Sequence, residues 1–382
     1  MPLQMLKCIN ANKIVVLLFL VIFSGCRNKA VTHKEVAVNQ QSILGLLAET
    51  DTTITYNLGL KKLSEYNFFK QPLNKLVPSS NQVIPYDLNA PLFTDYASKK
   101  RFIALPDGAK INYQEQGVLD LPNGTILIKN FFYKKDELTS ENQDIILETR
   151  LLIKHIETGD WTALPYVWNE AQTEAYLYIL GRDLEVSIVK DGDSTNQFSF
   201  TYSVPNSNMC KNCHVKDQKI VPLGPTARQL NRELNFNLGT YNQLVYLKEH
   251  KFLTKLEQLS LIDQLPDYLD STQPLNERAR AYLDVNCAHC HQKGGSAKTS
   301  GLHLTYEETD LYRLGLNKPP VAAGQGSGNL SFGIVAGQPD ASILLYRMKH
   351  LEPGIVMPEI GKNTLHKEGI ELIEAWIASL DE

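Results

Sequence analysis

Two copies of a Cys-x-x-Cys-His motif are the residues of this chain with the clearest chemistry. They span Cys210–His214 and Cys287–His291. This spacing is typical of covalent attachment of c-type haem, in which both thiols bond the porphyrin and the adjacent histidine ligates the iron. The sequence therefore predicts two covalent haem c groups. The predicted haem-binding residues are Cys210, Cys213, His214, Cys287, Cys290 and His291.

Paired cysteines also occur in zinc knuckles and in thioredoxin-like dithiols. A zinc site built from both pairs would use the four cysteines and leave His214 and His291 unexplained. A dithiol needs no histidine after its second cysteine. Two complete motifs in one chain favour haem attachment over both alternatives.

The N-terminus resembles a bacterial lipoprotein signal. Lys7 and Lys13 precede the apolar run Ile14–Phe23, which is too short to cross a bilayer as a stable span. The run ends in Phe23-Ser24-Gly25-Cys26, similar to a lipobox, so we expect residues 1–25 to be removed and Cys26 to be lipidated. The alternative is a plain signal peptide with an incidental cysteine.

The cysteine count agrees with export. Of six cysteines, Cys8 leaves with the signal and Cys26 takes the lipid. The remaining four form the two motifs, so no pair is left for a structural disulfide. Haem c is attached outside the inner membrane. We therefore expect a bacterial cell-envelope protein, lipid-anchored on the periplasmic side or at the cell surface.

Composition is ordinary for a globular protein, with 43% hydrophobic residues and a formal net charge of −4. No basic block stands out, which argues against nucleic-acid binding. Beyond the signal there is no second long apolar run, so the lipid is the expected contact with the membrane.

Residues 26–45 are polar and read as a tether. Residues 46–205 are expected to form a β-rich domain, sandwich or barrel-like, because short β-branched and aromatic runs alternate with turn signals. The expected strands are Arg101–Leu105, Thr125–Tyr133, Ile145–Ile156, Ala175–Leu180, Glu185–Lys190 and Phe198–Val204.

Residues 206–272, the first haem c region, and residues 273–382 are expected to be mainly α. In the last segment, Leu365, Leu372, Ile373, Trp376, Ile377 and Leu380 recur at helical spacing. The other expected helices are Pro225–Phe236, Tyr241–Phe252, Leu256–Leu265, Leu344–His350 and a helix from Leu275 to Asn286 with Asn276 as its N-cap.

Residues from about 275 to 382 resemble a class I cytochrome c domain. That family has a helix leading into Cys-x-x-Cys-His, a loop with a distal methionine and a C-terminal helix. The matching parts here are Asn276–Asn286, Cys287–His291, Met357-Pro358 and the helix ending near Leu380. The whole chain is similar to exported dihaem c-type cytochromes with a β-rich N-terminal region. The resemblance implies a multidomain protein whose last domain has the class I fold.

The iron ligands are only partly assigned. Met357 is the expected distal ligand of the second haem, while Met348 is expected to pack in a helix. For the first haem the candidates are His155, His250, or a methionine or histidine from the other haem region. A vacant sixth position, which would admit small molecules, is a further alternative.

These observations favour electron transfer outside the inner membrane. The expected partners are redox proteins: a dehydrogenase as donor, and a cytochrome or a terminal oxidase as acceptor. One rival function is a dihaem peroxidase-type oxidoreductase, against which the short interval between Cys210 and Cys287 counts. The other is an adaptor whose β-rich domain binds a ligand through aromatic residues, here Trp161, Tyr166 and Trp168.

Overall fold

A computed structural model describes residues 59–138, 143–189, 197–321 and 323–381. These residues belong to a compact unit that spans residues 50–382. The predicted signal peptide, Cys26 and the tether lie outside the described residues. Among the residues that are described, no helix is both long enough and apolar enough to cross a membrane.

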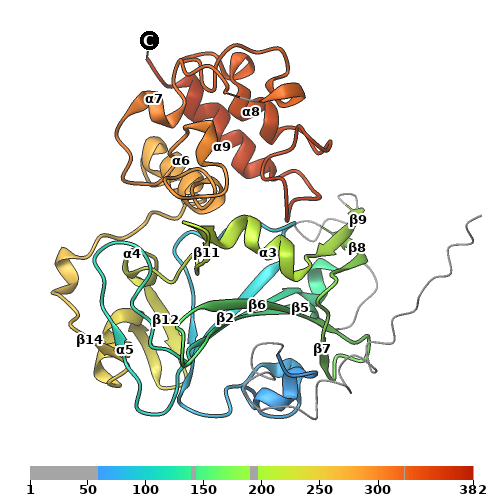
Figure 1. The fold of residues 1–382 in the computed structure, drawn as a ribbon, viewed down its shortest axis with the longest axis vertical. Helices are drawn as coiled ribbons and strands as arrows, with labels where there is room; N and C mark the ends of the chain where they lie inside the picture. The colour runs from blue at the N-terminus through green and yellow to red at the C-terminus, as the bar shows by residue number, and fades with distance from the viewer. Residues whose placement is uncertain (1–58, 139–142, 190–196, 322, 382) are drawn as a thin grey trace, which may run out of the picture. The chain divides into compact units, whose positions relative to one another are not determined.

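A six-stranded antiparallel sheet is the largest element (Figure 1). Its order is β1-β2-β4-β5-β6-β7, so neighbouring strands are close in the sequence. All six expected strands are present, four of them in this sheet and two as the separate hairpin β8-β9. The bounds are β1 Val83–Tyr86, β2 Ser98–Ala104, β4 Ile126–Tyr133, β5 Ile145–Lys154, β6 Trp161–Trp168, β7 Ala175–Leu177, β8 Arg182–Val189 and β9 Gln197–Val204.

The two faces of the sheet have different partners because side chains alternate along each strand. One face carries Phe102, Ile128 and Leu164, which pack with Leu63 and Leu73 from two 3-10 helices, Leu63–Tyr66 and Leu73–Lys75. The opposite face is apolar at both ends. It holds Ile103, Leu127 and Leu152 in one cluster and Phe131, Tyr133 and Val167 in another. Between these clusters the face is charged.

Short elements follow the sheet between residues 207 and 254. They are α3 Ser207–His214, α4 Ala227–Leu230, α5 Gln243–Glu249 and the strands β10 Val215–Lys216, β11 Lys219–Ile220, β12 Glu233–Phe236, β13 Gly239–Asn242 and β14 Leu253–Thr254. β14 pairs in parallel with β3, Ile111–Asn112. The pairs β10-β11 and β12-β13 are hairpins. Figure 1 shows α3 over the sheet, on the side that faces α6 and α9.

The C-terminal part is built around two packed helices, α6 Leu275–Leu283 and α9 Lys367–Ala378, with α7 Leu311–Leu314 and α8 Ile343–Met348 between them in the chain. Ile373, Trp376 and Ile377 on α9 are buried with Leu283 of α6. α6 begins after Pro274, so the expected N-cap at Asn276 is wrong. Asn276 instead accepts a hydrogen bond from Trp376 Nε1 at 3.0 Å and joins the two helices.

The expectation of mainly α haem c regions that end in a class I cytochrome c fold is also wrong. The chain is β-rich, contains a large antiparallel sheet and is only about 25% helix. Pro225–Phe236, expected to be one helix, forms a helix only over Ala227–Leu230 before β12 begins. Asn237 and Leu238 then turn the chain into β13, whose first residue, Gly239, has a φ of 128°. A turn of this kind favours hairpin pairing over continued helix.

Candidate functional site

Both Cys-x-x-Cys-His motifs line one cavity of about 1330 Å³. Pockets for a single drug-sized ligand are commonly about 300–1,000 Å³, so this cavity exceeds the need of one such molecule. Its lining includes all six predicted haem-binding residues and also Met357. The fold therefore brings together residues that are far apart in the sequence.

The first motif lies on α3. Asn206 caps this helix, because its side-chain oxygen accepts a hydrogen bond from the Met209 amide at 2.8 Å. Cys210 packs against the apolar cluster of the sheet that contains Leu127 and Leu152. The helix ends at His214 and the chain turns into β10.

The second motif follows α6 through one turn of π-helix, Asp284–Ala288. Cys287 packs against the core that α6 and α9 share. Hydrogen bonds from Cys290 N and His291 N to the Cys287 carbonyl, at 3.1 and 3.0 Å, close the turn after the π-helix. A single π-helical turn within or at the end of an α-helix is often found at functional sites.

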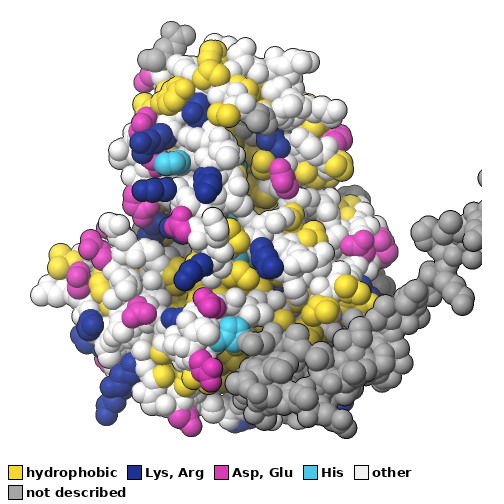
Figure 2. Space-filling model, viewed as in Figure 1, with side chains coloured by type: hydrophobic (Ala, Val, Ile, Leu, Met, Phe, Trp, Pro, Cys, Tyr) yellow, Lys and Arg dark blue, Asp and Glu magenta, His cyan; other side chains and the backbone are white. Residues whose placement is uncertain are grey.

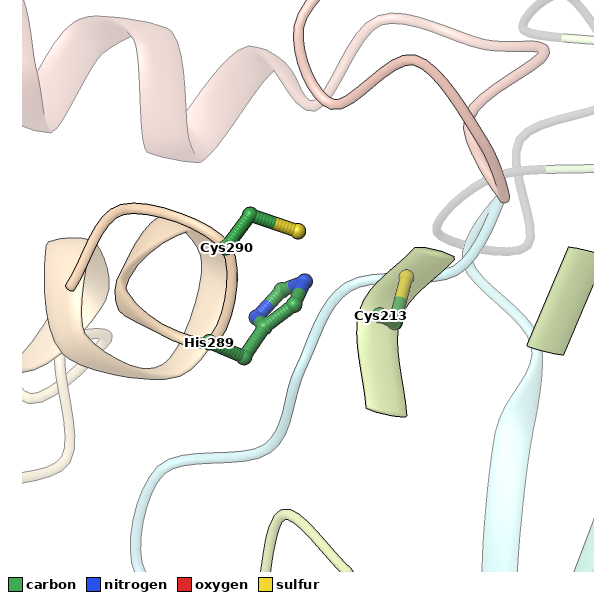
Figure 3. Close-up of side chains that lie close together, drawn as sticks. All are labelled: Cys213, His289 and Cys290. Atoms are coloured by element: carbon green, nitrogen blue, oxygen red, sulfur yellow. The ribbon is translucent and has the colours of Figure 1, made fainter. Parts of the chain in front are cut away.

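The two motifs are in direct contact. The Cys213 Sγ, a ring nitrogen of His289 and the Cys290 Sγ all lie within 4.8 Å of one another. Figure 3 shows His289 and Cys290 projecting from one turn toward Cys213. Ser296 Oγ donates to the Asn212 carbonyl at 2.7 Å and fixes this arrangement. Groups bound at the two motifs would therefore be neighbours.

In both motif histidines Nδ1 makes a hydrogen bond, which leaves Nε2 available to bind a metal. His214 Nδ1 lies 2.9 Å from the Val221 carbonyl oxygen. A carbonyl can only accept, so Nδ1 carries the proton and Nε2 keeps its lone pair. His291 Nδ1 lies 3.0 Å from Ser300 Oγ, which already donates its own proton to Ala297. Partners of this kind commonly orient histidines that ligate metals.

Burial lowers the pKa of His214 and of His291 to about 4. Both rings are therefore neutral at neutral pH, the form that binds a metal. The thiols respond differently. Burial raises the pKa of Cys210, and it raises the pKa of Cys287 to about 12. A hydrogen bond from the Cys213 thiol lowers the pKa of Cys290, so Cys290 is the more acidic of that pair.

Met357 lies in the cavity lining, on the loop between α8 and α9. Its amide donates to the Arg347 carbonyl at 3.2 Å, and its carbonyl accepts from Lys362 Nζ at 3.0 Å. Met348 is 5% exposed within the helical core, as expected of a packing residue, although it also borders the cavity.

The two histidines considered for the first haem lie elsewhere. His155 Nε2 is hydrogen bonded to Thr162 Oγ1 at 2.7 Å, and His250 Nδ1 to the Tyr246 carbonyl at 2.9 Å. Neither lines the cavity. His289 does line it, and its Nδ1 is buried without a hydrogen-bond partner among the described residues.

Of the aromatic residues considered for a ligand platform, only Trp161 borders the cavity. Tyr166 and Trp168 are buried in the opposite face of the sheet. Tyr166 donates to the Leu60 carbonyl at 2.8 Å and Trp168 Nε1 to Thr149 at 2.9 Å, so both polar groups are used inside the core.

Some residues of the cavity were missed from the sequence. Basic side chains at core-facing positions of three strands, Arg101, Lys129 and Arg150, border it. A signal was present at Lys129, which interrupts the apolar alternation of Leu127, Phe131 and Tyr133.

Comparisons of the chain with protein-family models, with curated proteins and with solved structures gave no significant match.

Proposed function

We propose that the protein is a dihaem c-type cytochrome that carries electrons outside the inner membrane. Cys210, Cys213 and His214 would hold one haem, and Cys287, Cys290 and His291 the other. The observation that carries the proposal is that both motifs line a single cavity of about 1330 Å³. When bound, haem supplies an iron that gains and loses one electron reversibly.

The residues fit this cofactor in three respects. Each motif contains two cysteines, and all four are free thiols. Each motif histidine is neutral and has its Nδ1 proton placed on an acceptor, which leaves Nε2 for iron. Met357 supplies a thioether in the same cavity for the second haem, and a His/Met ligand pair raises the reduction potential.

The arrangement suits a relay. Cys213 lies beside Cys290 and His289, so haems attached at the two motifs would be neighbours. Electron exchange weakens steeply with distance, so this proximity supports a relay. The chain around the motifs is held by hydrogen bonds between them, such as the 2.9 Å bond from Asp217 N to the Gly294 carbonyl. Fixed neighbouring sites need no conformational change between transfer steps.

A lipid on Cys26 and a tether over residues 26–45 would keep this relay near membrane-bound partners. The partners would be a periplasmic dehydrogenase as donor and another cytochrome or a terminal oxidase as acceptor. On the face shown in Figure 2, basic and acidic side chains are interspersed rather than segregated.

A peroxidase-type activity is the second candidate, and one observation favours it. His155 and His250 lie outside the cavity, so neither would cap the first iron. If no methionine or histidine of the other haem region ligates that iron either, its open position would admit peroxide.

A redox titration followed by visible spectra, with and without hydrogen peroxide, tests the two functions. The relay predicts two one-electron transitions of unequal potential and little peroxide turnover with a reduced small cytochrome. Fast turnover that is lost in His214→Ala but kept in His303→Ala, a histidine outside the cavity lining, would establish the peroxidase and contradict the relay.

A further inference from the structure

A row of three basic side chains crosses the middle of the sheet. Arg101 on β2 is directly opposite Lys129 on β4, and Lys129 is directly opposite Arg150 on β5. All three line the cavity. Like charges directly opposite one another destabilise a sheet, so this row requires negative charge close by.

The protein supplies part of that charge. Asp87 Oδ1 accepts from Arg101 Nη1 at 2.8 Å. Glu148, which is fully buried, accepts from Arg150 Nε at 2.8 Å and from the Tyr202 hydroxyl at 2.6 Å. The two ends of the row thus have carboxylate partners.

The centre of the row does not. Lys129 has no hydrogen bond or ion pair with any residue that the structure describes; its ammonium lies 4.8 Å from the ring centroid of Phe131. Arg101 is only 4% exposed, and its Nη2 is buried without a hydrogen-bond partner among these residues. Leaving a buried charged donor unpaired costs more than the usual value of a hydrogen bond. The Lys129 ammonium and Arg101 Nη2 are therefore two donors that lack an acceptor among the described residues.

The cavity as a whole is cationic. Nine basic and four acidic side chains line it, although the chain has a formal net charge of −4. A concave site lined by one sign of charge concentrates ligands of the opposite sign. The expected ligand is an anion with planar oxygen acceptors, which guanidinium and ammonium groups bind together.

The row is next to the first motif. Leu127 and Leu152 lie two residues from Lys129 and Arg150 on the same strand face, and Cys210 packs against the cluster that these leucines form. A carboxylate that reaches Lys129 therefore belongs to a molecule held near Cys210.

We propose that Arg101, Lys129 and Arg150 form a carboxylate-binding site, and that its occupant is a propionate of the haem attached at Cys210 and Cys213. That the occupant is a haem propionate depends on the proposed function. The preference for a carboxylate follows from the three basic side chains alone. The sheet then has a direct role: it neutralises the haem edge and excludes water from it. A free dicarboxylate is the other source of the same chemistry.

The test uses the full-length holoprotein and Lys129→Gln, with Lys100→Gln as the matched control. Lys100 lies on β2, the strand that pairs with the strand of Lys129. It is exposed and does not line the cavity. Lys129→Gln should keep both haems, shift the propionate bending band of one haem in the resonance Raman spectrum and lower the reduction potential of that haem. Loss of a nearby cation disfavours the added electron. Lys129→Arg should restore both values, and Lys100→Gln should change neither.

Thermal unfolding with added succinate separates the two sources. A rise in Tm with succinate that Lys129→Gln abolishes, with the Raman band unchanged, would assign the site to a free carboxylate and overturn the propionate as occupant. No change in band, potential or succinate response in Lys129→Gln would overturn the site itself. If the proposed function is wrong, wild-type protein will contain no covalent haem. In that case the succinate measurement still tests whether the three basic side chains bind a carboxylate.

Discussion

At the scale of single residues, hydrogen bonds decide what the motif histidines can do. Val221 and Ser300 fix the Nδ1 proton of His214 and His291, and burial keeps both rings neutral. Neither partner could be found from the motif spacing, because each acceptor is set by the local turn of the chain. The motif predicts the ligand, and the fold selects its tautomer.

Met357 is expected to ligate the second iron. Met357→Ala should remove the near-infrared sulfur-to-iron band of the ferric protein and lower the potential of one haem, because a thioether ligand stabilises the reduced iron. The control is Met348→Leu, which keeps the packing volume in the core at a cost below about 1.5 kcal/mol. Persistence of the band in Met357→Ala, together with its loss in the control, would assign the ligand to Met348.

Lys99 makes stability depend on pH. Burial, assisted by the charge of Arg101, lowers the pKa of Lys99 from its ordinary 10.5 to about 7. Between these values the unfolded chain binds more protons than the folded protein, so the free energy of unfolding rises with pH from about 7 toward 10.5. Lys99→Met should stabilise the protein at pH 7 and flatten this rise.

The measurement is chemical denaturation at several pH values between 7 and 9, below most of the range in which tyrosines titrate. Lys100→Met, on the exposed side of the same strand, should retain the wild-type slope. An equal slope in wild type and Lys99→Met would show that the Lys99 ammonium is solvated in the folded protein.

At the scale of elements, short helices place the two motifs. α3 has only eight residues, so its cap and its contact with the sheet matter more than its own helix propensity. Asn206→Ala should cost about 0.5–2 kcal/mol of stability through the lost cap. Asn208→Ala, at an exposed position of the same helix, should change stability by less than about 0.5 kcal/mol. Equal effects of the two variants in urea denaturation would contradict the capping role.

α9 holds the second motif through its packing on α6. Ile373 is fully buried in their shared core, so Ile373→Ala should cost about 2–5 kcal/mol. Glu371→Ala, on the exposed side of α9, is the control, with an expected change below about 0.5 kcal/mol. Thermal unfolding followed by circular dichroism gives both values; a loss below about 1 kcal/mol in Ile373→Ala would mean that the α6-α9 core is loosely packed.

Elements with a strong local pattern could be predicted, and those set by distant contacts could not. The strand Thr125–Tyr133 and the helix at the C-terminus were found because their apolar spacing spans enough residues to define a period. Trp161–Trp168 was missed as a strand, since its aromatic residues and Pro165 obscure the alternation. The class I cytochrome c fold was inferred from the order of a few motifs, which does not fix the path of the chain between them.

At the scale of the whole molecule, the cavity combines residues from the sheet, α3, the turn after α6 and the loop before α9. The motif cysteines and histidines could be named from the sequence, because their chemistry depends on local spacing. The shared cavity, the contact of Cys213 with Cys290 and the basic row on the sheet could not, since each joins segments far apart in the chain.

If each motif holds one covalent haem, as proposed, the haem content per chain is the decisive measurement. Protein produced in a host that attaches haem c should give two haems per chain in the pyridine haemochrome assay after denaturation. Cys210→Ala with Cys213→Ala, and separately Cys287→Ala with Cys290→Ala, should each give one. Wild-type protein that contains zinc held by Cys213, His289 and Cys290, and no covalent haem, would contradict the account.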